Sequence, residues 1–323
     1  MSVLTPANRP SRVVELPSVP GLTALYGKAV LPSPHDIAGA VSSKLPFGKS
    51  AVPTVEASTL RLPDVTYLVR GVKGEPSHIV DYQRLLGEPV SDVLPAGYVH
   101  VLGFPVAMAL MVSAEFPLPV MGMVHLRNSV SVARTIRTGE QLNILAWAQN
   151  MTGHAKGTSV ELVVEAYADE EVVWRGVSTY LAKGKYLVGR GDESGQIDRA
   201  EFSAPLPTGR WQLGGSIGRQ YAAVSGDRNP IHMSALTAKA FGFPRAIAHG
   251  MYTAARALSE AGRMRPDAYE WTVEFAKPVL LPGKVDVSIR GDAGVGGTGA
   301  VTYAGWNGKS GKVHFTGKIT PLG

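Results

Sequence analysis

An acid and an imidazole stand five positions apart in the segment that runs from Tyr221 to His232. The segment reads Tyr-Ala-Ala-Val-Ser-Gly-Asp-Arg-Asn-Pro-Ile-His, so Asp227 and His232 flank an Asn-Pro turn. A carboxylate and an imidazole held together can bind one water molecule and transfer its protons. This spacing therefore predicts acid/base chemistry on water.

A second patch, Ala-His-Gly-Met, begins at Ala248, where an apolar helix is predicted over 246–261. Backbone N–H groups at a helix start suit a developing oxyanion, and Gly250 is the predicted donor. His249 is more typical of a packing or loop-fixing residue than of a second catalytic acid, and both interpretations stay open. An acid, a base and an oxyanion donor are the groups needed to add water across a double bond beside a carbonyl.

The remaining polar residues of the first segment have supporting roles. Ser225 and Gly226 allow a tight turn, Asn229 is expected to fix the loop and orient Asp227 or the water, and Tyr221 is a supporting residue. A lone Gly-Asp or Asn-Pro is most often an ordinary turn. It is the conjunction of these residues with the later His-Gly that points to a site.

Two other patterns have alternative explanations. The run from Gly294 to Gly299 fits a dinucleotide fingerprint, but a strand is predicted after it where a helix is required, so a hairpin loop is expected. The run from Gly214 to Gly218 fits a nucleophile elbow around Ser216. The residues before it make a poor core strand, so we do not expect a serine nucleophile.

Composition limits the classes of function. The 323 residues are 45% hydrophobic and 18% charged, as in a globular protein with a large core. The absence of Cys excludes disulfides, Cys-based metal sites and a thiol nucleophile, and fits a cytoplasmic location. The net charge of +6 favours anionic partners, but no dense basic run indicates nucleic acid. No spacing suggests a metal site.

The longest uncharged stretch, 93–114, has no Asp, Glu, Lys or Arg. Pro95, Gly97 and Pro105 interrupt it and no basic cluster flanks it, so a buried core helix is expected and not a membrane span. Within it, Tyr98 and His100 are expected to be mainly structural. Its apolar residues line either an acyl tunnel or the ordinary core, with the core favoured: Phe104, Met108, Met111 and, just beyond the stretch, Phe116.

The order of elements repeats along the chain. A Pro-rich extension over 1–60 is expected to wrap the domain or be partly mobile, and 184–207 is the predicted linker. On each side of that linker, a short apolar helix precedes several long strands of alternating pattern. We predict two similar α+β units, 61–183 and 208–323, that pack side by side and so cover their sheet edges.

The Tyr221 to His232 segment, together with His249-Gly250-Met251, resembles the signature of the MaoC-like (R)-specific enoyl-thioester hydratases. The resemblance implies a double hot-dog fold, in which each repeat wraps an antiparallel sheet around a central helix. The first repeat lacks Gly-Asp-x-Asn-Pro-x-His and is similar to the degenerate N-terminal repeat of two-repeat actinobacterial members. One active site per chain is implied, with the first repeat as an acyl-binding wall.

The resemblance also implies the chemistry. Asp227 and His232 would activate water that adds to C3 of a trans-2-enoyl thioester, and the Gly250 N–H would bind the thioester oxygen. No cofactor is expected, since CoA or the phosphopantetheine of an acyl carrier protein is part of the substrate. A hot-dog thioesterase and a non-catalytic acyl-thioester-binding subunit are the alternatives. Acyl length, carrier, direction, and monomer or homodimer stay open.

Overall fold

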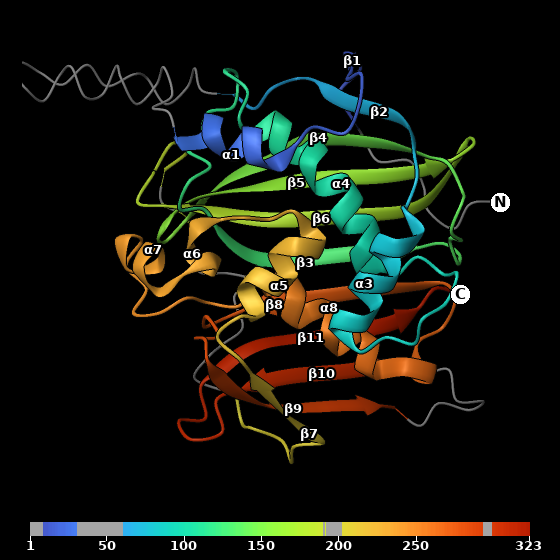
Figure 1. Ribbon diagram of the computed structural model, residues 1–323. Helices are drawn as coiled ribbons and strands as arrows, with labels where there is room; N and C mark the ends of the chain where they lie inside the picture. The colour runs from blue at the N-terminus through green and yellow to red at the C-terminus, as the bar shows by residue number, and fades with distance from the viewer. Residues whose placement is uncertain (1–8, 31–60, 190, 192–201, 293–298) are drawn as a thin grey trace, which may run out of the picture.

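Residues 9–30, 61–189, 191, 202–292 and 299–323 are described by the computed structural model of the chain. A single curved sheet of eleven strands runs through both predicted repeats, with the helices gathered on one face (Figure 1). The strand order is β1-β2-β4-β5-β6-β3-β8-β11-β10-β9-β7. The predicted α+β double hot-dog architecture is confirmed.

The first half of the sheet consists of strands with long alternating apolar patterns. They are β2 (Thr66–Val72), β3 (Val124–Val132), β4 (Leu142–His154), β5 (Gly157–Ala168) and β6 (Glu171–Lys183). The second half contains β7 (Gly209–Leu213), β8 (Tyr269–Phe275), β9 (Gly283–Gly291), β10 (Val301–Trp306) and β11 (Val313–Pro321).

The two halves join through antiparallel pairing of β3 with β8, in register from Arg127 opposite Glu274 to Val132 opposite Tyr269. This pairing removes one open edge from each half-sheet, as expected from the cost of unpaired strand edges. The core follows the same continuity, because one cluster of buried apolar side chains extends through both halves. Residues 190 and 192–201 of the predicted linker lie outside the described residues, as do residues 294–298 of the predicted glycine-rich hairpin loop.

Two long helices lie across the sheet. The helix α4 (Ala96–Met111) is buried on almost every side, which explains its uncharged sequence, and α8 (Gly250–Ala261) is its counterpart in the second half. Each is preceded by a shorter helix, α3 (Pro76–Leu86) or α5 (Ile217–Ser225). No helix of the described residues is long and apolar enough to cross a membrane.

The candidate tunnel residues of the first half lie mainly in the core. Met108, Met111 and Phe116 are buried, whereas Phe104 is half-buried and its ring stacks on His100. Tyr98 is fully buried, and its hydroxyl is hydrogen-bonded to His78.

The described part of the N-terminal extension packs against the rest of the molecule. The strand β1 (Val13–Glu15) pairs in parallel with β2, and the helix α1 (Leu22–Val30) contacts α4. The sequence pattern did not predict these two elements. It also did not predict the short helices α6 (Pro230–Met233) and α7 (Ala235–Ala240), which project beside α5 in Figure 1.

The prediction that the residues before Ser216 make a poor core strand is confirmed. They do form a strand, β7, and α5 begins directly after Ser216. The strand is nevertheless the last in the sheet, not a central one. Within the described residues, no hydrogen bond joins Ser216 to an imidazole. His232 and His249 are hydrogen-bonded to backbone carbonyls instead.

Candidate active site

The carboxylate of the site stands at the end of α5. That helix terminates at Gly226, whose left-handed backbone (φ 72°) favours glycine and turns the chain sharply before Asp227. The backbone N–H of Asp227 donates to Ser225 Oγ at 3.2 Å. The side chain is 23% exposed, so the carboxylate is reachable yet mostly enclosed.

Asn229 fixes the loop that follows. Its backbone N–H donates to Asp227 Oδ1 at 3.1 Å, and its side-chain oxygen caps α6 by accepting the N–H of Ile231 at 3.3 Å. The capped helix then carries His232 toward the carboxylate. Pro230, at the first helical position, fits because that position needs no N–H donor.

His232 is held in one tautomer. Its Nδ1 lies 2.8 Å from the carbonyl oxygen of Ile247, and a carbonyl only accepts, so Nδ1 carries the proton and Nε2 is free. Burial, and to a lesser degree the nearby His249, lower the pKa of His232 to about 3. The imidazole is therefore neutral at physiological pH and its Nε2 can act as a base.

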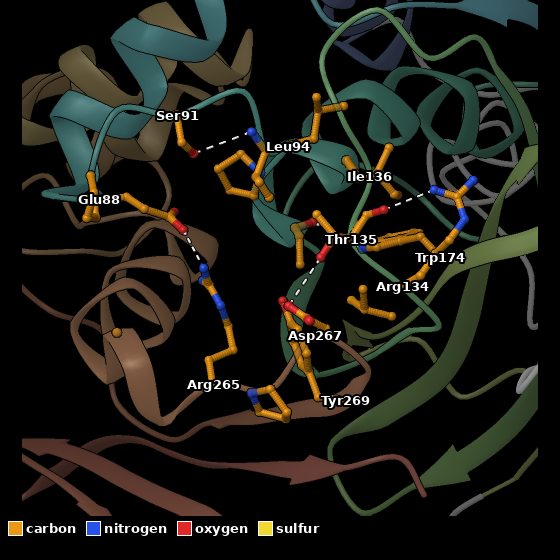
Figure 2. A pocket seen from close by; sticks show the side chains of 18 residues that line it. Glu88, Ser91, Leu94, Arg134, Thr135, Ile136, Trp174, Arg265, Asp267 and Tyr269 are labelled. Atoms are coloured by element: carbon orange, nitrogen blue, oxygen red, sulfur yellow. Dashed lines mark hydrogen bonds and ion pairs between the residues drawn. The ribbon is translucent and has the colours of Figure 1, made fainter. Parts of the chain in front are cut away.

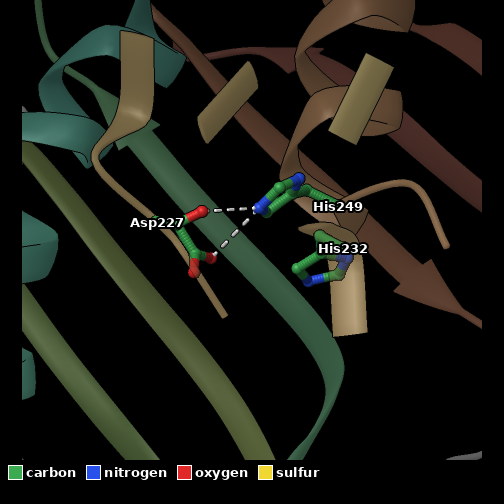
Figure 3. Close-up of side chains that lie close together, drawn as sticks. All are labelled: Asp227, His232 and His249. Carbon is green, nitrogen blue, oxygen red and sulfur yellow. Dashed lines mark hydrogen bonds and ion pairs between the residues drawn. The ribbon is translucent and has the colours of Figure 1, made fainter. Parts of the chain in front are cut away.

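His249 closes the other side of the site (Figure 3). Its Nε2 donates to the backbone oxygen of Asp227 at 2.9 Å and lies 3.7 Å from Oδ2 of the same residue. Its ring stacks on His232 with centroids 3.6 Å apart, and Tyr221 packs against it at 5.0 Å. These contacts match the loop-fixing role expected from the sequence.

Asp227 is charged in this setting. Burial by itself would raise its pKa, but His249, His232, the hydroxyl of Tyr26 and the N–H of Asn229 together hold the pKa below the ordinary value. Its Oδ1 accepts hydrogen bonds from Tyr26 and Asn229, while Oδ2 accepts none from the described residues. Oδ2 is thus left without a protein hydrogen-bond donor and can accept one from water.

Asp227, His232 and His249 each have one side-chain oxygen or nitrogen in the site, and these three atoms lie within 4.8 Å of one another. An acid and two imidazoles are also a possible cation ligand set. The hydrogen bond from His249 Nε2 to a carbonyl, however, places a proton on the nitrogen that faces Asp227. The geometry fits a bound water better than a metal ion.

The predicted oxyanion donor, Gly250, lies at the start of α8. Gly250 is the first residue of that helix, where N–H groups have no carbonyl partner within the helix. A Cβ at this position would stand 3.0 Å from the ring of Phe275, so the backbone approaches the β8 side chain closely. The N-cap residue His249 makes no side-chain capping bond, which leaves the first turn open.

Side chains of the first half complete the surroundings. His100, His125 and Tyr180 are near enough to Asp227 to affect it electrostatically, and burial lowers the pKa of His100 to about 4 and of His125 to about 3. The rings of His125 and Tyr180 stack at 4.5 Å. No sequence pattern pointed to Tyr26, His125 or Tyr180, because tertiary folding alone brings them to the site.

Comparison with known proteins identifies the protein family of the chain. Residues 216–301 match the MaoC-like domain, and the chain is 34% identical over 245 residues to 3-hydroxyacyl-thioester dehydratase X of Mycobacterium tuberculosis, covering 76% of this chain and 86% of that protein. The chain belongs to the MaoC-like dehydratase family. It is accordingly an enzyme of the hydro-lyase class.

Other relatives agree with this assignment. The crystal structure of HtdX of Mycobacterium tuberculosis superposes with a TM-score of 0.68 at 30% identity, covering 79% of this chain and 99% of that one. The 3-hydroxybutyryl-CoA dehydratase of Methylorubrum extorquens is 36% identical over 74 residues, which cover 22% of this chain and 47% of that protein. A MaoC-like dehydratase from Phytophthora capsici, at 19% identity and a TM-score of 0.64 over 81% of this chain and 96% of that one, shares the fold.

A cleft of about 230 Å³ lies between the two halves, away from the Asp227 site (Figure 2). Glu88 and Arg265 form an ion pair of 2.8 Å across it, and the beginning of α4 lies at its wall. It contains none of the residues that the sequence singled out for chemistry.

Proposed function

We propose that the enzyme reversibly hydrates trans-2-enoyl thioesters to (R)-3-hydroxyacyl thioesters, within the fatty-acid metabolism of its family. The observation that carries this proposal is the convergence of the Asp227 carboxylate and the His232 and His249 imidazoles within 4.8 Å, next to the open first turn of α8. The substrates named for two relatives, a 3-hydroxyacyl thioester and 3-hydroxybutyryl-CoA, belong to the same class.

In the hydration direction, Asp227 Oδ2 would accept a hydrogen bond from water and hold it toward C3. His232 Nε2, unprotonated and facing the site, would take one proton as the oxygen–C3 bond forms. The electron pair of the C2–C3 double bond moves toward the thioester, and C2 then receives the proton from His232. Water is thereby added as hydroxide at C3 and a proton at C2.

The thioester oxygen gains negative charge during this step, and the Gly250 N–H is the donor we assign to it. The positive end of the α8 dipole adds to that stabilisation. A single backbone oxyanion donor contributes about 3 kcal/mol in other enzymes. In the dehydration direction, the same groups remove the C2 proton and protonate the leaving hydroxyl.

His249, Ser225 and Asn229 would act by fixing Asp227, since each bonds to its backbone or carboxylate. Tyr221 would support His249 from behind. We retain two sequence-based assignments as part of the proposal: the first repeat forms the acyl-binding wall, and the thioester carrier is CoA or an acyl carrier protein.

The direct test is hydration of crotonyl-CoA, followed as loss of the enoyl absorbance, with chiral analysis of the 3-hydroxybutyryl product. We expect the (R) product. Release of free thiol without loss of the double bond would instead indicate a thioesterase, and tight acyl-CoA binding without turnover would indicate a binding subunit.

A further inference from the structure

A tyrosine from the N-terminal extension reaches the catalytic carboxylate. Tyr26, in α1, donates its hydroxyl to Asp227 Oδ1 from 201 positions away in the sequence. It lies outside the 216–301 segment that matches the MaoC-like domain. The contact therefore joins a segment beyond the matched family domain to the residue on which the proposed chemistry depends.

The helix that carries Tyr26 is anchored at the site. Leu22 and Leu25 are buried at 7% and 5% exposure. Leu22 lies against the turn that precedes Asp227, since a Cβ on Gly226 would be 3.0 Å from its Cδ1. The same helix contacts α4. Packing thus fixes the position of the Tyr26 ring independently of its hydroxyl.

The two oxygens of Asp227 have different surroundings. Oδ1 accepts from the Tyr26 hydroxyl and from the Asn229 N–H, two donors that fix the plane of the carboxylate. Oδ2 lies 3.7 Å from His249 Nε2, beyond hydrogen-bonding distance. The division leaves one oxygen saturated by protein donors and the other available to water.

We propose that Tyr26 is a positioning residue for the hydration reaction: its hydroxyl locks Asp227 Oδ1 so that Oδ2 alone binds the attacking water. This inference rests on the proposed function. Burial, followed by the charge of Asp227, raises the pKa of the Tyr26 phenol, so it stays protonated and acts only as a donor. A donor to the ionised carboxylate lowers the pKa of Asp227, which keeps the water-binding form populated.

Several other titratable groups face Asp227 and share control of its charge. They come from every element around it: His100 of α4, His125 of β3, Tyr180 of β6, Tyr221 of α5, His232 of α6 and His249 at the start of α8. Because these groups are unchanged when Tyr26 is substituted, a change in the pH profile reports the hydroxyl itself.

The test is Tyr26→Phe in the full chain, which keeps the ring and removes the hydroxyl. We expect kcat for crotonyl-CoA hydration to fall about tenfold, the loss typical of one hydrogen bond to a charged group. KM should change by less than about twofold, since the hydroxyl is not assigned to substrate binding. The acidic limb of the kcat profile should move to higher pH, because Asp227 loses a donor to its ionised form.

A matched control is Tyr167→Phe, which also removes a tyrosine-to-carboxylate hydrogen bond, to Glu165 at 2.9 Å on β5. Its pH profile should equal that of the unmodified enzyme. If Tyr26→Phe retains the original kcat and acidic limb, the positioning role is wrong. If the unmodified enzyme hydrates no enoyl thioester, whether short or long and on CoA or on an acyl carrier protein, the proposed function fails instead, so the two failures are distinguishable.

A second variant tests the same hydrogen bond even if Tyr26→Phe fails to fold. Replacing Tyr26 by 3,5-difluorotyrosine keeps the hydrogen bond and makes the hydroxyl a stronger donor, so the acidic limb should move to lower pH. A shift in the same direction as the phenylalanine variant, or no shift, would overturn the proposal. A purely structural role for the ring predicts no change in the profile from this variant.

Discussion

The loops after α3 and α5 have similar backbone conformations but place different side chains around their acidic residue. Each helix ends at a glycine in the left-handed region, Gly87 (φ 71°) or Gly226 (φ 72°), and each glycine is followed by an acid, Glu88 or Asp227. Each loop then forms an isolated antiparallel bridge, at Val93 or Ile247, before its long helix begins. The two repeats therefore place an acid and a helix start in equivalent positions.

The difference lies in what surrounds the acid. Only five residues, 88–92, separate Gly87 from the bridge in the first repeat, whereas 227–246 fill the same interval in the second and form α6 and α7. That insertion supplies His232. The position before the long helix holds Pro95 in the first repeat and His249 in the second.

The two acids consequently have different partners. Glu88 forms an ion pair with Arg265, and its side chain is only 9% exposed, whereas Asp227 is hydrogen-bonded by Tyr26 and His249 and lies near His232. Arg265 neutralises Glu88 through its Oε1, and no histidine is among the residues that line its cleft, so no imidazole stands beside this acid to take a proton from water. The comparison teaches that the backbone frame is common to both repeats, and that the inserted helices and the N-terminal segment set apart the repeat in which we propose the active site.

The strongest test of this contrast is to remove each acid in turn. Asp227→Asn should reduce kcat for crotonyl-CoA hydration by about 10³-fold or more, because it removes the group proposed to orient the water. His232→Ala should reduce kcat by a similar factor, because it removes the proposed base. Glu88→Gln should leave kcat within about twofold. Circular dichroism would verify folding, and equal losses in the Asp227 and Glu88 variants would contradict a single site.

The two helix starts offer the next test. Gly250→Ala places a Cβ 3.0 Å from Phe275, so the N–H should move off the thioester oxygen and kcat should fall about 10- to 100-fold. A substitution at the equivalent position of the first repeat, Ala96→Gly, removes a Cβ at the start of α4 and should leave kcat nearly unchanged. Steady-state kinetics measure this, and an unaltered Gly250→Ala variant would contradict the expected displacement of the N–H.

The pH profile tests the base. A histidine of ordinary pKa, near 6.5, would lose about 30-fold of its neutral form between pH 8 and pH 5. His232 has a pKa of about 3 and Asp227 has a lowered pKa, so the neutral imidazole and the carboxylate both persist at pH 5. We expect kcat/KM to stay flat from pH 5 to pH 8; an inflection near pH 6.5 would contradict this.

The smallest expected effect concerns stability. Glu88→Gln leaves Arg265 without its ionic partner in a largely enclosed cleft, which should lower the free energy of unfolding by about 1–2 kcal/mol. Denaturant titration would measure it. A destabilised variant that keeps its kcat would show that the first-repeat acid serves structure and the second serves chemistry.

Much of the fold could be predicted from local patterns. The helix ending at Gly87, the uncharged helix from Ala96 and the later strands follow from apolar periodicity and glycine stops, signals that act over a few residues. The predicted helix over 246–261 begins only at Gly250, because the preceding residues are drawn into the bridge between Ile247 and Leu280. Such tertiary pairing leaves no local signal.

The sequence by itself determined the part of the proposed site that is linked along the chain: Asp227, Asn229 and His232 lie within six residues, and one capped turn orients them. Only the tertiary structure decided the rest. The protonated nitrogen of His232 depends on a carbonyl at Ile247, and the orientation of Asp227 depends on a hydroxyl at Tyr26. Both partners reach the site through packing across long sequence separations, which no pattern of nearby residues encodes.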